Sequence, residues 1–253
     1  MTWASRLGAW KMIFSTALAE RLVYRGDFAL GTLMRFLPIV TQIFLWFAIF
    51  AAVQNENDGE ASIGGFRYRD MVAYYLLTMI ARAFSSMPGL ASSIARQIRE
   101  GEIKRYLIQP LDLISFLLLS RIAHKMAYYV IAVLPFALVF YLCRDYFIEG
   151  WPPPYRLAAF AGSLVMGFLV GFFLEATIGM IGFWFLEVTS LLFVFMLFSF
   201  FLSGHMFPLT LLPGWIGDVV QFLPFKYLAY FPAAVFLGKV PDDELAFEMA
   251  IQA

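Results

Sequence analysis

Side chains that could do chemistry are few in this chain, and two carboxylates stand out among them. Of the 253 residues, 62% are hydrophobic and 14% are charged. Glu175 and Glu187 lie in its apolar second half. A charged group at the centre of a bilayer costs about 2.5–3.5 kcal/mol, and such groups often mark proton pathways. We interpret both acids as structural or interfacial, with a proton relay as the alternative.

Other kinds of reactive site find no support in the sequence. Ser203 and His205 flank a glycine as in intramembrane serine proteases, but Phe201 stands where that class has another glycine. The spacing His-Glu-x-x-His is absent, and the one cysteine, Cys143, excludes an internal disulfide and a cysteine-built metal site. No glycine-rich loop ends in Gly-Lys-Ser/Thr, and the net charge is zero. We therefore expect no enzyme activity, cofactor, metal or nucleic-acid partner, and any ATP hydrolysis must occur on another chain.

The densest run of charge is the segment Ile94 to Asp112, which we call the elbow. Gly101 interrupts a helical pattern, Pro110 stops it, and Asp112 is placed to cap the following helix. Apolar stretches of membrane-crossing length lie on both sides. The pattern predicts a helix–turn–helix that projects from a membrane protein into water. By spacing alone, a simple solvated connector is an equal alternative to a docking element.

The remaining sequence predicts an all-α, polytopic membrane protein forming one domain over residues 1–253. Aromatic residues make up 19% of the chain. Residues 1–29 alternate apolar and basic positions at helical spacing, which favours an amphipathic helix in the membrane interface. Residues 30–202 hold five expected spans, at 30–53, 71–94, 126–142, 157–176 and 187–202, with a separate interfacial helix at 113–125. In the fourth span, Gly162, Gly167 and Gly171 permit close helix contact.

Beyond the fifth span, residues 203–244 are rich in proline and predict short helices at the outer surface, and we call them the short-helix segment. Pro213 and Pro224 bracket one such helix. Residues 245–253 begin another apolar helical stretch, too short to cross a core of about 30 Å. We expect this stretch to be the start of a sixth span in a longer chain, with a frayed terminal helix as the alternative.

Lysine and arginine counts predict the orientation. The N-terminal segment and the elbow region carry ten such residues, and the alternate loops carry six. Because basic residues concentrate on the cytoplasmic side, we expect the N-terminus and the elbow in the cytoplasm.

Two motifs resemble those of ABC-2-type exporter permeases. Arg99-Glu100-Gly101-Glu102, followed by Tyr106-Leu107-Ile108-Gln109-Pro110-Leu111, is similar to the coupling loop R-x-G-x-(few)-L-x-x-P-L. The run from Ser203-Gly204 through Phe207-Pro208, Leu212-Pro213, Trp215 and Leu223-Pro224-Phe225 to Tyr227 is similar to the segment between the last two spans of that family. The resemblance covers nearly the whole chain and is closest to a bacterial subgroup that works with a second permease.

This resemblance implies a permease subunit of an ATP-driven exporter in the bacterial cytoplasmic membrane. Its partners would be a separate ABC ATPase, a second permease subunit and the lipid bilayer, and its substrate an amphiphilic or apolar compound. The implied ATPase-coupling residues are Arg96, Arg99, Glu100, Gly101, Glu102, Ile103, Lys104, Arg105 and Tyr106, with Ile98, Ile103 and Tyr106 making the apolar contact. The implied outer gate comprises Gly204, Phe207, Pro208, Pro213, Trp215, Pro224 and Tyr227. Two alternatives remain: a proton-coupled carrier that uses Glu175 and Glu187, and a membrane scaffold whose elbow docks a soluble protein.

Overall fold

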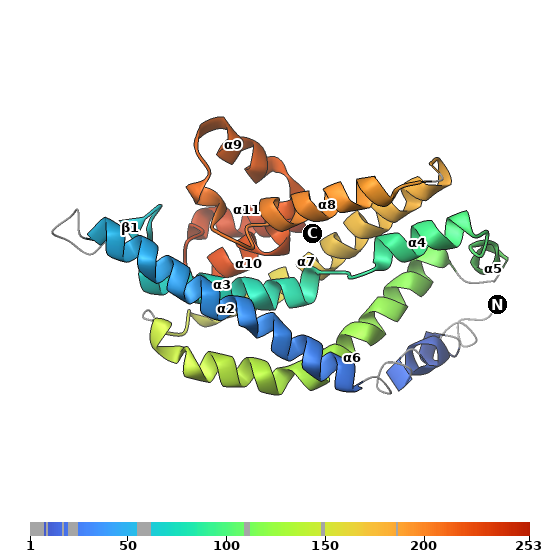
Figure 1. Cartoon of the computed structure of the whole chain (residues 1–253), viewed down its shortest axis with the longest axis horizontal. Coiled ribbons are helices and arrows are strands. Elements are labelled where there is room, and N and C mark those ends of the chain that lie inside the picture. Colours follow the sequence, from blue (N-terminus) through green and yellow to red (C-terminus); the bar gives the residue numbers. More distant parts are fainter. Residues whose placement is uncertain are drawn as a thin grey trace.

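The computed structural model is almost entirely helical, which confirms the all-α prediction (Figure 1). It describes residues 8, 10–16, 18–19, 25–54, 62–108, 112–147, 150–185 and 187–253. Residues 10–16 are helical, and much of the expected interfacial helix lies outside the described residues.

Within the described residues, the chain runs through five long helices and a series of short ones. The long helices are α2 (Arg25–Gln54), α3 (Tyr68–Ser85), α6 (Leu113–Leu142), α7 (Pro154–Met180) and α8 (Thr189–Leu202). Helix α4 (Leu90–Arg99) leads into the elbow, which holds the second half of α4 and the whole of α5 (Lys104–Leu107). The remaining helices are η1 (Arg144–Tyr146), η2 (Ile181–Phe183), η3 (Leu209–Leu211), α9 (Gly214–Phe222), η4 (Pro224–Leu228), α10 (Tyr230–Phe236) and α11 (Asp242–Gln252). Strands β1 (Ser62–Ile63) and β2 (Phe66–Arg67) form an antiparallel hairpin, with Ser62 opposite Arg67.

Three stretches of the described residues are long and apolar enough to cross a membrane: Phe36–Val53, Leu113–Leu142 and Pro154–Phe183. The protein is therefore a multi-pass membrane protein. The expected span at 71–94 is divided, because α3 ends at Ser85 and α4 starts at Leu90. The expected span at 187–202 corresponds to the apolar helix α8, which has 14 residues. The expected total of five spans stays a prediction.

Helix α6 differs from its prediction, because residues 113–125 and 126–142 form one continuous helix of 30 residues. The basic side chains that suggested a boundary bind carbonyl groups instead. Arg121 Nη1 donates to the Pro88 carbonyl at 3.0 Å, and Lys125 Nζ donates to the Ala83 carbonyl. Pro135 lies inside α6, which is visibly bent in Figure 1. A proline within a helix removes one backbone hydrogen bond and commonly causes such a bend.

One face of α7 carries glycines at four-residue steps, and other segments approach it closely. A Cβ atom at Gly167 would lie 3.0 Å from the Tyr227 carbonyl oxygen, and one at Gly171 would lie 2.1 Å from the Ser85 carbonyl oxygen. A Cβ atom at Gly179 would lie 2.9 Å from the Ala91 carbonyl oxygen. Glycine is therefore required at Gly171. The predicted close contact is confirmed at Gly167 and Gly171, whereas at Gly162 a Cβ atom would meet only side chains, with Met249 Cε at 3.2 Å.

The best-buried packing lies where the short-helix segment meets α3 and α7. Ala229, Ala233 and Ala234 have no exposed surface, and α10 lies against both α3 and α7. The neighbouring core joins α2, β2, α3 and α10 through Trp46, Phe50, Phe66, Met71, Tyr74, Leu77 and Ala233. In Figure 1 this region lies toward one end of the long axis, and α4 and α5 lie at the other. The molecule therefore has two distinct ends.

The expected helical stretch at residues 245–253 belongs to α11, which starts three residues earlier. Asp242, Asp243 and Glu244 form its first turn, where negative charge favours a helix N-terminus. Near its other end, Gln252 is buried and its Nε2 donates to the Ser163 carbonyl at 2.9 Å. Helix α11 is therefore attached to α7 along its described length.

Candidate functional site

The break between α3 and α4 gathers several polar contacts inside the apolar part of the molecule. Gly89 has a φ of +74°, which permits the turn between the two helices. Interrupted helices leave backbone carbonyl and amide groups that need partners where water is absent. Here Ser85 Oγ donates to the Leu228 carbonyl at 2.7 Å, and the Tyr129 hydroxyl donates to the Ala83 carbonyl at 3.4 Å. Together with Arg121 and Lys125 of α6, these contacts fix the break against its neighbours.

Glu175 of α7 binds the other side of this break. Its carboxylate lines the same cavity as Met87 and Ala91, interacts with their backbone N–H groups, and lies in the field of Arg82 and Arg121. Ala91 is the second residue of α4, so the carboxylate meets an otherwise unsatisfied amide at the positive end of that helix. Glu175 is therefore partnered within the protein rather than at a lipid-facing surface.

A cavity of about 600 Å³ adjoins the break. Its polar lining includes Arg82, Glu175 and His205, and its apolar lining includes Met79, Phe136, Leu192, Phe193, Phe195 and Met196. This volume lies in the range of small-molecule sites, which are mostly apolar with a few polar groups. Tyr75 stacks on the His205 ring with centroids 5.7 Å apart. Burial, with a contribution from Arg82, lowers the pKa of His205 to about 4, so this side chain is neutral near pH 7.

The turn of the elbow has the predicted form. Gly101 has a φ of +71°, a conformation that favours glycine. The Gly101 amide donates to the Ile98 carbonyl and the Ile103 amide to the Gln97 carbonyl, both at 3.1 Å. Asp112 caps α6 by accepting from the Ser115 amide at 2.7 Å. Gln109, Pro110 and Leu111 lie outside the described residues.

The charged side chains of the elbow are exposed, and its ion pairs lie at the surface. The exposed residues are Arg96, Arg99, Glu100, Glu102, Lys104 and Arg105. Arg105 pairs with Glu102 at 3.1 Å, and Arg99 pairs with Glu187 at 3.6 Å. Surface pairs of this kind contribute little to stability. The charged side chains of the elbow can therefore exchange these partners for groups on another protein at little cost in folding free energy.

The apolar residues of the elbow differ from their expected role. Ile103 is 7% exposed, Ile98 packs against the core around Leu90 and Phe172, and the Tyr106 ring lies 5.1 Å from that of Phe116. Ile103 is therefore buried within this chain and unavailable to a partner, because the turn at Gly101 folds it inward. Ile108 is 83% exposed and was not among the predicted contact residues. In the sequence, only the position of Ile108 just after a short helix in a charged segment indicated that its side chain would be exposed.

The two carboxylates that lie twelve residues apart occupy different environments. Glu187 is exposed, accepts a hydrogen bond from the Thr189 amide at 3.0 Å and pairs with Arg99 of the elbow. Hydrogen bonds from Thr189 lower the pKa of Glu187. Glu175 lines the cavity instead. The interfacial interpretation thus fits Glu187, whereas Glu175 has a structural partner inside the protein.

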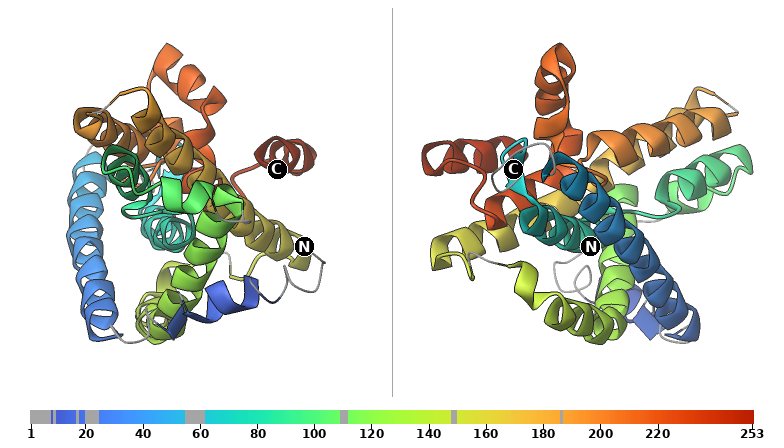
Figure 2. Two further views of the ribbon diagram at one scale, coloured as in Figure 1. Left: turned by 90° about the vertical axis from the view of Figure 1, so that its right-hand side faces the viewer. Right: turned by 60° about the vertical axis from the view of Figure 1, so that its left-hand side comes forward.

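The expected gate residues divide into a buried and an exposed group. Gly204 and Pro208 are buried and Phe207 is half-buried, and the Tyr74 hydroxyl donates to the Gly204 carbonyl. Pro213 and Pro224 bracket α9 as predicted, and both are exposed. Trp215 is 74% exposed on α9, which stands apart from the other helices (Figure 1 and Figure 2). The structure thus brings Gly204 and Pro208, but not Trp215, into the packed region.

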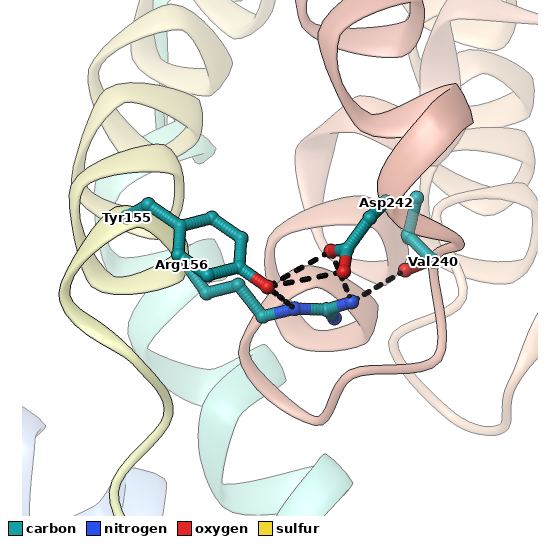
Figure 3. Close-up of polar contacts among 4 residues, drawn as sticks. All are labelled: Tyr155, Arg156, Val240 and Asp242. Carbon is teal, nitrogen blue, oxygen red and sulfur yellow. Dashed lines mark hydrogen bonds and ion pairs between the residues drawn. The ribbon is translucent and has the colours of Figure 1, made fainter.

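Two polar clusters bind α11 to the rest of the protein. Tyr227 donates its hydroxyl to Glu248 Oε2 at 2.7 Å, and Lys226 Nζ lies 2.8 Å from the same oxygen. At the start of α11, Arg156 Nη2 donates to Asp242 at 2.6 Å and to the Val240 carbonyl at 3.2 Å (Figure 3). The Tyr155 hydroxyl donates to the same carboxylate at 3.1 Å. Sequence reasoning identified Tyr227 but missed Arg156 and Glu248, whose partners are distant in the chain.

Comparison with known proteins agrees with the architecture. Residues 36–253 match the family model described as ABC-2 family transporter protein. No curated protein matches the sequence significantly. The matched region includes the elbow, the cavity and the short-helix segment, and the family is the membrane component of transporters that associate with an ABC ATPase subunit. The chain therefore belongs to the ABC-2 transporter family.

Proposed function

We propose that this protein is the permease subunit of an ATP-driven exporter in the bacterial cytoplasmic membrane. The elbow faces the cytoplasm, where a separate ATPase subunit binds it. The observation that carries this proposal is the position of the α3–α4 break, since one segment both lines the cavity and begins the elbow helix. A force applied to α4 by the ATPase therefore acts directly on the cavity wall.

The lining of the cavity supports an amphiphilic or apolar substrate. Methionine, phenylalanine and leucine side chains provide most of the surface, and Arg82, Glu175 and His205 provide polar contacts. Such a lining suits a compound with a large apolar part and a small polar group. The cavity is thus the substrate site of the proposed exporter.

The elbow surface supports docking through charge. Arg96, Glu100 and Lys104 are exposed, and Ile108 adds an apolar contact. Complementary charges across an interface guide association and set specificity. A second permease subunit completes the transporter, and the short-helix segment gates the outer exit through Gly204, Phe207, Pro208 and the exposed Trp215 of α9.

Affinity purification tests the partnership. In mild detergent, the tagged protein should recover a nucleotide-binding subunit in near-stoichiometric amount. Gly101→Val should insert normally but lose that subunit, because valine is strained at a φ of +71°. Gly65→Val is the matched control, since Gly65 has a φ of +80°, also has open space around its missing Cβ, and lies in the β-hairpin.

Each alternative function predicts a different result. Recovery of no ATPase, with uptake driven by a proton gradient alone, would establish a secondary carrier. Recovery of a soluble protein without a nucleotide site would establish a scaffold. Equal ATPase recovery by the Gly101→Val and Gly65→Val variants would show that the elbow is not the coupling element.

Thiol labelling tests the orientation. In a Cys143→Ser background, single cysteines replace Lys104 in the elbow and Asp218 in α9, both exposed positions. An impermeant thiol reagent added to intact cells should label Asp218→Cys and spare Lys104→Cys. The reverse pattern would place the elbow outside the cell, where no ATPase could reach it.

A further inference from the structure

We infer that Glu175 is the positioning residue that holds the first turn of the elbow helix α4 against α7 and so links the cavity to the elbow. The inference rests on the proposed function for its mechanical consequence. Its structural part, the placement of α4 by one carboxylate, stands independently.

On the α7 face that carries its close glycine contacts with the break, Glu175 supplies a charged side chain between two glycines. Gly171, Glu175 and Gly179 are spaced four residues apart and thus share one helix face. Gly171 meets the Ser85 backbone and Gly179 meets the Ala91 backbone, both within distances that leave no room for a Cβ atom. The backbone on either side of the break therefore packs directly on two glycines of α7. Glu175 lies between these two glycines on the same helix face.

The groups that Glu175 meets are those that the break leaves without helical partners. Its carboxylate shares the cavity wall with Met87 in the break and with Ala91 in the first turn of α4, and it interacts with the amides of both residues. The neighbouring Pro88 carbonyl is bound by Arg121 of α6. Glu175 of α7 thus interacts with amides of the break, and Arg121 of α6 binds a carbonyl of the break. These contacts from two helices fix the direction in which α4 leaves the break.

We expect the negative charge of Glu175, as well as the shape of its side chain, to hold α4 in place. A carboxylate at a helix N-terminus interacts favourably with the aligned peptide dipoles, and Arg82 and Arg121 add attraction. Glutamine has nearly the same shape but lacks this charge. A role in packing alone would therefore leave Glu175→Gln silent, whereas positioning by charge would not.

Distance measurement between spin labels tests the placement in the permease alone. In a Cys143→Ser background, labels replace the exposed residues Arg96 on α4 and Thr177 on α7. The parent protein should give one narrow distance distribution. Glu175→Gln should add a longer-distance population, and Glu175→Asp, which keeps the charge, should retain the single one.

Glu187→Gln is the matched control, because it makes the same chemical change at an exposed carboxylate that pairs with the elbow through Arg99. It should leave the distribution unchanged. The inference is overturned if Glu175→Gln leaves the distribution unchanged, or if Asp and Gln at this position disturb it equally. Neither result depends on an ATPase partner, so failure of the proposed function would be recognised separately.

A fluorescent label in the cavity tests the mechanical link in the complex purified with its ATPase. Phe193 lines the cavity on α8, and an environment-sensitive fluorophore on Phe193→Cys should change its emission when ATP is added. Glu175→Gln should abolish this change while the ATPase still co-purifies, and Glu187→Gln should preserve it. An unchanged ATP response in Glu175→Gln would show that elbow motion reaches the cavity by another route.

Discussion

The elbow and the short-helix segment are both built from short helices, but they are held in opposite ways. In the elbow, the ion pairs Arg99–Glu187 and Arg105–Glu102 join exposed side chains. In the short-helix segment, Lys226 pairs with Glu248 of α11, and the two side chains are only 11% and 22% exposed. Charges at a surface are screened by water and exchange partners easily, whereas a removed partner in a buried pair is costly. One end is thus suited to bind another protein, and the other to hold a fixed shape.

The largest effect is expected from breaking the partly buried pair between Lys226 of the short-helix segment and Glu248 of α11. Glu248→Ala leaves the Lys226 ammonium and the Tyr227 hydroxyl without their carboxylate, which should cost about 3 kcal/mol of unfolding free energy. Thermal unfolding in detergent measures the loss. The double variant Lys226→Met/Glu248→Ala should recover part of it, because no unpaired charge remains. Equal stability of single variant and parent would contradict the assignment of this end as the fixed one.

A slightly smaller loss is expected where α7 packs against the end of α3. Gly171→Ala places a Cβ atom 2.1 Å from the Ser85 carbonyl oxygen, so backbone must move, at a cost of about 1–3 kcal/mol. Gly31→Ala is the control, since Gly31 lies in α2 with open space around it. That control should be neutral or stabilising by up to about 1 kcal/mol, because alanine favours a helix. Similar unfolding temperatures for both variants would show that α3 and α7 do not need this close contact.

A modest effect is expected at the end of the elbow, where Asp112 caps α6. Asp112→Ala should cost about 1 kcal/mol, because the Ser115 amide loses its acceptor. Hydrogen bonds from Ser115 lower the pKa of Asp112 below its ordinary value of 3.8. The cap therefore stabilises the fold fully above about pH 4 and loses its contribution as the pH falls through the lowered pKa. Unfolding measured against pH should show a smaller difference between parent and variant in strong acid.

The smallest effect is expected at the exposed elbow pair. Arg99→Gln should leave the unfolding temperature of the isolated permease unchanged, because both partners of the Arg99–Glu187 pair are solvated. The same variant should weaken ATPase recovery in affinity purification and make that recovery less sensitive to salt, because one screened charge contact is lost. A marked loss of stability in the isolated protein would show that the elbow, like the short-helix segment, is held by its charges.

The sequence alone determined the fold class, the elbow turn and the bracketed helix α9. Hydrophobic composition and length indicate membrane helices, and Gly101, Asp112, Pro213 and Pro224 act through the backbone of their own neighbourhood. Turns and helix caps of this kind depend on neighbouring residues, so they can be predicted without knowledge of the fold. The motif resemblance likewise rests on short stretches, and it led to the family that the comparison with known proteins establishes.

Only the tertiary structure decided which charges are partners and which are free. The sequence predicts that Arg121 and Lys125 interrupt a span, but they bind carbonyl groups in the break and in the last turn of α3, more than 30 residues earlier. Glu175 and Glu187 looked equivalent in sequence, yet one meets the amides of α4 and the other meets water. Ile103 was assigned to a partner surface, but the turn buries it. Hydrogen bonding and desolvation depend on distance in space, and in this chain those distances are set by the glycine face of α7, where separate segments come into backbone contact.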